Sequence, residues 1–183
     1  MSLTPSEMMP LGTKASKFDL FDTITEQNVS LEDIHVKAGL FVMFICNHCP
    51  YVKHVNAALV KLANDYKNKI SFIAISSNDV VNYPEDHPDR MKEYGETLKY
   101  PFPYLYDESQ EVAKAYNAVC TPDFFLFDKD LLCVYRGQID GSRPGNDVLS
   151  NARTIRTVFD QLISGEEIDE KQVPSIGCNI KWK

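Results

Sequence analysis

The sequence lacks a concentration of positive charge. Its 19 lysines and arginines are outnumbered by 26 aspartates and glutamates, the formal net charge is −7, and no extended basic run occurs. Proteins that bind nucleic acid gather positive charge on one face, so we expect no nucleic-acid partner.

Long apolar runs are also missing. The longest run, residues 39–46, is far shorter than the roughly 20 residues that cross a bilayer. Residues 1–12 have no basic start, apolar core or small-residue cleavage site, so we expect no secretory signal. These features predict a cytoplasmic protein without a membrane partner, in which thiols stay reduced.

The chain has no internal repeat and no low-complexity tract, and its 183 residues suffice for one core rather than two. We expect one domain over residues 1–183, with an N-terminal arm (1–16) and a C-terminal tail (166–183). Apolar patterns predict strands at 18–21, 29–31, 40–45, 70–76, 102–105, 124–127 and 133–136, and helices at 47–67, 90–98, 109–116 and 148–163. This order predicts an α/β fold: a central mixed β-sheet flanked by helices, with an N-terminal β-hairpin extension.

Five cysteines are present, at irregular spacing: Cys46, Cys49, Cys120, Cys133 and Cys178. An odd, irregular set is a poor disulfide framework and suits one working pair with additional thiols. Cys46 and Cys49, separated by Asn47 and His48, are the candidate pair. Two cysteines one helical turn apart can form a disulfide at modest strain.

The expected position of this pair favours a thiolate. A strand ends just before Cys46 and a helix is expected from Asn47, so unpaired backbone N–H groups and the helix dipole would face the Cys46 sulfur. An imidazolium at His48 would stabilise the same anion. We therefore expect Cys46 to be a nucleophile with a lowered pKa and Cys49 to be the resolving thiol.

Two other interpretations of the cysteine pair remain open. Both cysteines could be core residues, or they could form half of a zinc site. A zinc site usually takes a second close Cys or His pair, and none follows in the sequence. We favour a redox pair, and expect no metal and no cofactor.

A second motif, Thr121-Pro122, precedes the expected strand at 124–127, and a proline at a strand entrance is compatible with a cis peptide bond. Together, FICNHCPYVK (residues 44–53) and CTPDFFLFD (residues 120–128) resemble the thioredoxin superfamily. They are most similar to its peroxiredoxin-like branch, also called redoxin or alkyl hydroperoxide reductase–thiol-specific antioxidant-like. Further matches are residues 135–138, 142–144 and 174–178.

The resemblance implies a thioredoxin-like fold, with Pro122 as a cis-proline that packs against the cysteine pair. It also implies that Thr121 offers backbone groups to an incoming substrate. Thioredoxins proper have Trp where Ile45 stands, and peroxiredoxins proper have Thr or Ser where Met43 stands. Dithiol exchange is therefore expected ahead of peroxide reduction.

Three residues are possible auxiliaries of the site. Cys120 and Cys178 could be additional resolving thiols or buried apolar residues, and Arg143 could supply a cation to a peroxide.

The sequence thus leaves three candidate functions. The first is a thiol-disulfide oxidoreductase that acts on a protein or small-molecule disulfide and is recharged by an unidentified thiol reductant. The second is a peroxiredoxin-like peroxidase. The third is a non-catalytic module that binds a soft metal or a peptide.

Overall fold

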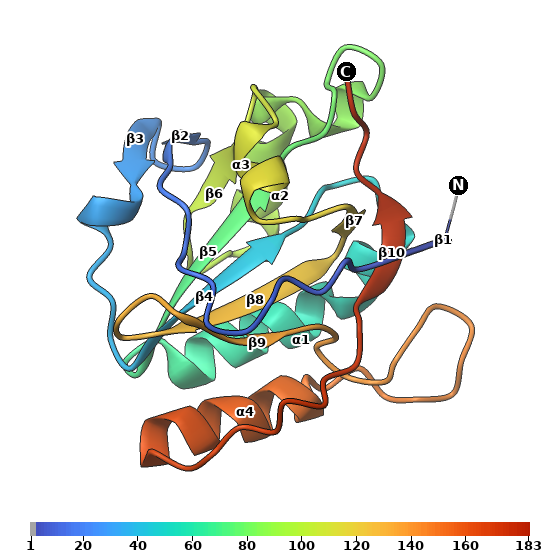
Figure 1. Ribbon diagram of the computed structural model, residues 1–183. Coiled ribbons are helices and arrows are strands. Elements are labelled where there is room, and N and C mark those ends of the chain that lie inside the picture. The colour runs from blue at the N-terminus through green and yellow to red at the C-terminus, as the bar shows by residue number, and fades with distance from the viewer. Residues whose placement is uncertain (1–2) are drawn as a thin grey trace.

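Two fully buried strands, β4 (Gly39–Phe44) and β5 (Ile70–Ser76), form the centre of the main sheet. The computed structural model describes residues 3–183 (Figure 1). The sheet has seven strands in the order β3-β2-β6-β5-β4-β8-β9, and the pairs β4–β5 and β5–β6 are parallel while the others are antiparallel. The other strands are β2 (Asp19–Asp22), β3 (Gln27–Ser30), β6 (Tyr104–Tyr106), β8 (Asp123–Asp128) and β9 (Cys133–Arg136). The expected mixed sheet and N-terminal hairpin are confirmed.

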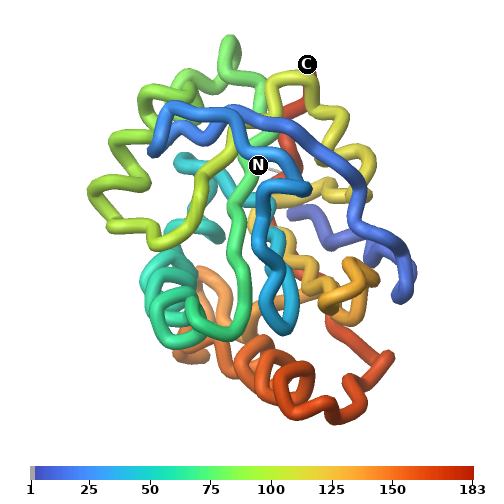
Figure 2. Tube along the Cα trace, turned by 90° about the vertical axis from the view of Figure 1, so that its left-hand side faces the viewer, coloured from blue at the N-terminus to red at the C-terminus, as the bar shows by residue number. Residues whose placement is uncertain are grey.

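Helices cover both faces of this sheet because side chains alternate along each strand. One face packs against α1 (Pro50–Tyr66), α2 (Pro88–Leu98) and α4 (Arg153–Ser164). The other face packs against α3 (Glu111–Ala115) and the N-terminal segment. Figure 2 shows the same division, with α1 and α2 (teal and green) on the opposite side of the sheet from α3 (yellow).

Aromatic contacts hold α4 against the sheet. The ring of Phe41 in β4 stacks on Phe124 in β8 at 5.7 Å and meets the edge of Phe159 in α4 at 5.1 Å. Such pairs contribute roughly 0.5–1.5 kcal/mol each beyond their buried area.

A second sheet, which the sequence did not predict, lies beside the first. Its order is β1 (Leu3–Pro5), β10 (Ile176–Asn179) and β7 (Cys120–Thr121), all antiparallel. The expected N-terminal arm and C-terminal tail therefore both contribute strands, and β10 lies against the residue that precedes Pro122 (Figure 1).

All four helices, α1 to α4, differ from their expected bounds, and α2 begins two residues earlier than expected, at Pro88. Helix α1 begins at Pro50, three residues later than expected, because proline fits the first helical position, where no N–H is needed. Helix α3 has five residues instead of eight, and α4 begins five residues later than expected, after Ala152 with a positive φ of 59°. Gly165 closes α4 as expected, with φ 71°. Within residues 3–183, no helix has the length and apolar character needed to cross a membrane.

Candidate active site

The Cys46–Cys49 segment is a loop between β4 and α1 rather than the first turn of the helix. Cys49 occupies the N-cap with an extended backbone (φ −67°, ψ 122°), and Pro50 is the first helical residue. Two hydrogen bonds fix the Asn47 side chain. Its amide N–H group donates to the Glu85 carbonyl at 2.8 Å, and its amide oxygen accepts from the Tyr104 hydroxyl at 3.1 Å. The site residues thus come from the carboxyl end of β4 and from segments distant in the sequence.

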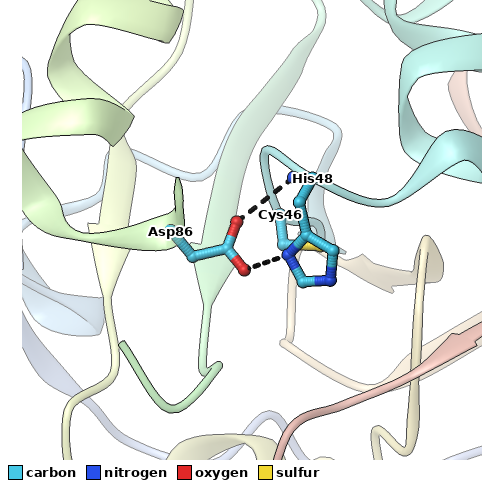
Figure 3. Close-up of side chains that lie close together, drawn as sticks. All are labelled: Cys46, His48 and Asp86. Atoms are coloured by element: carbon cyan, nitrogen blue, oxygen red, sulfur yellow. Dashed lines mark hydrogen bonds and ion pairs between the residues drawn. The ribbon is translucent and has the colours of Figure 1, made fainter. Parts of the chain in front are cut away.

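Asp86, a residue that the sequence analysis missed, organises this loop. Its carboxylate is fully buried and accepts hydrogen bonds from the backbone N–H groups of Asn47 (2.8 Å) and His48 (3.3 Å). It also lies 2.5 Å from His48 Nδ1 and accepts from the Asn78 amide at 2.8 Å. Figure 3 shows both contacts with His48, with Cys46 close by. No sequence signal marked Asp86, because it stands in a proline-rich stretch that resembles an exposed loop.

The surroundings of Cys46 raise its pKa instead of lowering it. The loop amides that were expected to stabilise a Cys46 thiolate donate instead to this carboxylate. Burial is the largest cause that raises the pKa of Cys46 well above its ordinary value, the hydrogen bond to Cys49 is the second, and the negative charge of Asp86 adds to them. The expectation of a lowered pKa at Cys46 is therefore wrong.

The favourable position for a thiolate is Cys49. Its pKa is lowered, first because the Cys46 thiol donates to its sulfur and then because the Cys178 thiol lies 2.9 Å away. The backbone amides of Val52 and Cys178 lower it further, and burial opposes them. The two pKa shifts have opposite directions, so the Cys49 thiol loses its proton more readily than the Cys46 thiol does.

His48 is an ion-pair partner of Asp86. Its hydrogen bond to Asp86 is the main cause that raises the His48 pKa, while burial opposes the shift. The imidazole stacks on the Tyr83 ring, with 5.4 Å between centroids, and the His48 side chain is 16% exposed. The expected imidazolium is supported, but its closest negative partner is a carboxylate rather than a Cys46 thiolate.

The Thr121–Pro122 peptide bond is cis, as expected. Thr121 contacts both sulfurs of the pair. Its hydroxyl lies 3.3 Å from Cys46 Sγ, and its carbonyl oxygen lies 3.2 Å from Cys49 Sγ. The structure therefore brings together the two motifs that are more than 70 residues apart in the sequence.

The possible auxiliary residues have different positions. Cys178 lies beside Cys49, whereas Cys120 is a buried thiol whose closest polar contact is the Pro122 carbonyl at 3.8 Å. The Arg143 guanidinium donates to the carbonyls of Asp140 and Ser142 and to the Gln138 side chain. The structure therefore does not bring Arg143 to Cys46, and the expectation that it could polarise a peroxide there is not supported.

One group of donor atoms within residues 3–183 has the composition of a metal site. Atoms of Cys46, His48 and Asp86 lie within 4.8 Å of one another. The Asp86 carboxylate, however, already accepts the hydrogen bonds of two backbone amides and of Asn78 and lies against His48 Nδ1. A cation there would have to break the contact between His48 and Asp86, so the geometry favours an ion pair between side chains over metal ligation.

Access to the sulfurs is narrow. Cys46 is 1% exposed and Cys49 is fully buried. An open depression borders the motif on the side of Asn47 and His48, and Lys53, Arg90 and Tyr94 line its far part. Asn47 and His48 are the residues of the motif that line this depression, and neither cysteine is among its lining residues.

Asp123, directly after Pro122, is a second buried acid. Burial raises its pKa to about 7, although the Ser6 hydroxyl (3.0 Å) and the Phe124 N–H (3.1 Å) both donate to it. In the unfolded chain an aspartate titrates near about 4, so the folded state holds the extra proton between about pH 4 and 7. Stability from this group is thus complete below about pH 4 and is lost as the pH rises to about 7.

An Asp123→Asn variant should remove this loss, because an amide keeps an oxygen acceptor and cannot ionise. We expect the variant to exceed the original protein in unfolding free energy at pH 7.5 by up to about 4 kcal/mol, with little difference near pH 4. Urea unfolding across this pH range measures both. Parallel pH profiles for the two proteins would contradict the assignment.

Comparisons with known proteins agree with this architecture. An uncharacterized conserved protein from Geobacillus kaustophilus is 56% identical, over 100% of this chain and 97% of that chain, with a TM-score of 0.98. A hypothetical protein from Sinorhizobium meliloti 1021 is 42% identical, over 98% of each chain, with a TM-score of 0.95. The peroxidoxin BcpB from Mycobacterium tuberculosis shares the fold at 16% identity (86% of this chain, 98% of that chain, TM-score 0.63).

None of the curated proteins compared with the chain matches it. The AhpC/TSA family, in contrast, matches residues 11–136, which include the cysteine pair, Asp86 and the Thr121-Pro122 motif. The chain therefore belongs to the AhpC/TSA family, on a thioredoxin-like fold.

Proposed function

We propose that the protein is a thiol-disulfide oxidoreductase that exchanges two electrons with a disulfide substrate through Cys46 and Cys49. The observation that carries the proposal is that both sulfurs contact Thr121, the residue before Pro122: Cys46 Sγ lies 3.3 Å from its hydroxyl and Cys49 Sγ lies 3.2 Å from its carbonyl oxygen. The lowered pKa of Cys49 and the raised pKa of Cys46 support a pair in which one sulfur is a thiolate while the other keeps its proton.

Cys46 is the sulfur that attacks. Its Sγ lies within 4.8 Å of a ring nitrogen of His48, which lines the open depression, whereas Cys49 Sγ contacts the Thr121 carbonyl oxygen and Cys178 Sγ. Transfer of a proton from Cys46 to Cys49 generates the Cys46 thiolate, and the more basic of two thiolates is the stronger nucleophile.

The reaction balances over two steps. The Cys46 thiolate attacks the substrate disulfide, which forms a mixed disulfide and releases one substrate thiolate. Cys49 then loses its proton and attacks Cys46 Sγ, which closes the Cys46–Cys49 disulfide and releases the second substrate thiolate. The protein loses two electrons and the substrate gains them, and the His48 imidazolium can protonate the first leaving thiolate because it lines the depression.

The burial of both sulfurs favours a small-molecule disulfide as the substrate. A protein disulfide would reach Cys46 only if the segment around Tyr83 and Asp86 moved away, since it lies over His48 and the motif loop. In a reducing cytoplasm, a thiol reductant returns the pair to the dithiol state.

Peroxide reduction is the second candidate function. Membership of the AhpC/TSA family and the narrow access to Cys46 both favour a small oxidant. Against it, Met43 is fully buried and carries no hydroxyl, and Arg143 donates to groups away from the sulfurs. Dithiol exchange therefore remains the first proposal.

Substitution of the resolving thiol tests the proposed order of attack. A Cys49→Ser variant, treated with oxidised glutathione, should accumulate a mixed disulfide on Cys46, because no second thiol of the pair can release it. Mass spectrometry of the intact and digested protein locates the adduct. A Cys133→Ser variant is the control, since Cys133 is buried on the opposite face of the sheet. An adduct on another cysteine, with Cys46 unmodified, would contradict the proposal.

A further inference from the structure

A third sulfur, that of Cys178, lies beside the cysteine pair. Cys178 Sγ lies 2.9 Å from Cys49 Sγ, and Cys178 is 3% exposed. Cys46, Cys49 and Cys178 all belong to the same buried cluster. Cys49 therefore interacts with the sulfurs of both Cys46 and Cys178.

The pairing of β10 with β7 brings Cys178 close to Cys49. Strand β10 pairs with β7 so that Cys178 faces Thr121, the residue whose carbonyl oxygen contacts Cys49. A side chain at Gly177 would place a Cβ 1.9 Å from the Thr121 carbonyl oxygen, so glycine is required for β10 to approach this closely. Closure of the Cys49–Cys178 bond would shorten the sulfur distance by only about 0.9 Å, to the usual disulfide length.

We infer that Cys178 is a third redox-active thiol, which moves the disulfide from Cys46–Cys49 to Cys49–Cys178 by internal exchange. The inference rests on the proposed function, since that reaction forms the first disulfide. Cys178 attacks Cys49 Sγ, the Cys49–Cys178 bond forms, and the Cys46–Cys49 bond breaks. The proton passes from Cys178 to Cys46, and the number of electrons in the protein does not change.

The exchange separates oxidation of the protein by the substrate from its later reduction by a thiol, because the two steps then use different disulfides. After it, Cys46 is again a thiol close to His48, while the disulfide joins Cys49 to Cys178 of β10. Cys178 is paired in register with Leu3 of β1.

The raised pKa of Cys178 agrees with an internal exchange that occurs only after the Cys46–Cys49 disulfide has formed. Burial is the first cause that raises the pKa of Cys178, and its hydrogen bond to Cys49 is the second. Cys178 therefore stays protonated in the reduced protein, where Cys49 carries the negative charge. Once Cys49 enters a disulfide, its contribution to the raised pKa of Cys178 is gone, and the contribution of burial remains.

Disulfide mapping tests the inference. The purified protein and its Cys46→Ser, Cys178→Ala and Cys120→Ala variants are oxidised with diamide, alkylated, digested and analysed by mass spectrometry. We expect Cys46→Ser to form the Cys49–Cys178 disulfide in near-stoichiometric amount and Cys178→Ala to form only Cys46–Cys49. The control, Cys120→Ala, should match the unsubstituted protein, in which both disulfides are found.

Alkylated Cys49 and Cys178 in oxidised Cys46→Ser, under conditions that form Cys46–Cys49 in the unsubstituted protein, would overturn the inference. The unsubstituted protein supplies a test that does not depend on whether the variants fold. If oxidised unsubstituted protein contains no Cys49–Cys178 disulfide-linked peptide, the inference is overturned as well. Neither result touches the proposed function, which fails instead if Cys46→Ser keeps full turnover of a disulfide.

Discussion

A Cys46→Ser variant should lose turnover of a small disulfide by at least about 10³-fold, as expected when the attacking atom of a catalytic unit is removed. The serine hydroxyl is not ionised near neutral pH, and it preserves the size of the buried side chain. The contact with the Thr121 hydroxyl, at 3.3 Å from Cys46 Sγ, can persist, so we expect little change in stability.

The same variant separates the candidate functions when two oxidants are compared. Stopped-flow measurements follow reduction of oxidised glutathione and consumption of hydrogen peroxide by the reduced protein. We expect the unsubstituted protein to reduce the disulfide and to consume peroxide no faster than a simple thiol does. Rapid peroxide consumption that disappears in Cys46→Ser would favour the peroxidase, and full disulfide turnover in this variant would reject both functions at this site. Cys133→Ser serves again as the control.

An Asp86→Asn variant should be less stable than the original protein by about 2–4 kcal/mol. The buried carboxylate accepts hydrogen bonds from two loop amides, His48 and Asn78, and an amide side chain has one oxygen and no charge with which to replace it. Urea unfolding at pH 6 measures the loss. A loss below about 0.5 kcal/mol would contradict the organising role of Asp86.

The pH dependence of the unfolding free energy distinguishes an ion pair between Asp86 and His48 from a role of Asp86 in packing alone. The pKa of Asp86 is lowered, so its contribution is present above about pH 4, the ordinary range of aspartate, and is lost as the pH falls through the folded-state value. The pKa of His48 is raised, so its contribution is complete below about pH 6.5 and is lost as the pH rises through the folded-state value. The ion pair therefore stabilises most between about pH 4 and 6.5.

In Asp86→Asn this maximum should flatten, and the His48 pKa, followed by NMR of its ring protons, should fall. The Cys46 pKa should fall as well, because the negative charge that helps to raise it is removed. An Asp89→Asn variant is the matched control, since Asp89 is an exposed acid near the same helix start. An unchanged His48 pKa would show that Asp86 does not hold the imidazolium.

The apolar pattern was sufficient to predict the framework that carries the site. Strand β5 lies where residues 70–76 were expected, and β4 differs by one residue at each end. Both are buried on two faces, and an uninterrupted apolar run between polar segments is typical of such strands. The cis Thr121–Pro122 bond was also expected, although through the family resemblance rather than through the residues alone.

The electrostatics of the site could not be predicted in the same way. Asp86 lies 40 residues after Cys46, and its burial depends on packing between a turn and a loop that no local pattern encodes. The start of α1 at Pro50 moved the helix N-terminus from Cys46 to Cys49. Strand β10 is four residues long and pairs with segments far away in sequence, so the contact of Cys178 with Cys49 had no local signal.

Thiolate absorbance at 240 nm, titrated with pH in the reduced protein and in two variants, tests the assignment of the negative charge most directly. If Cys49 carries it, the absorbance that titrates well below the ordinary thiol range should persist in Cys46→Ser, where the serine hydroxyl can still donate, and should vanish in Cys49→Ser. The opposite pattern, with low-pH absorbance lost in Cys46→Ser and kept in Cys49→Ser, would contradict the account.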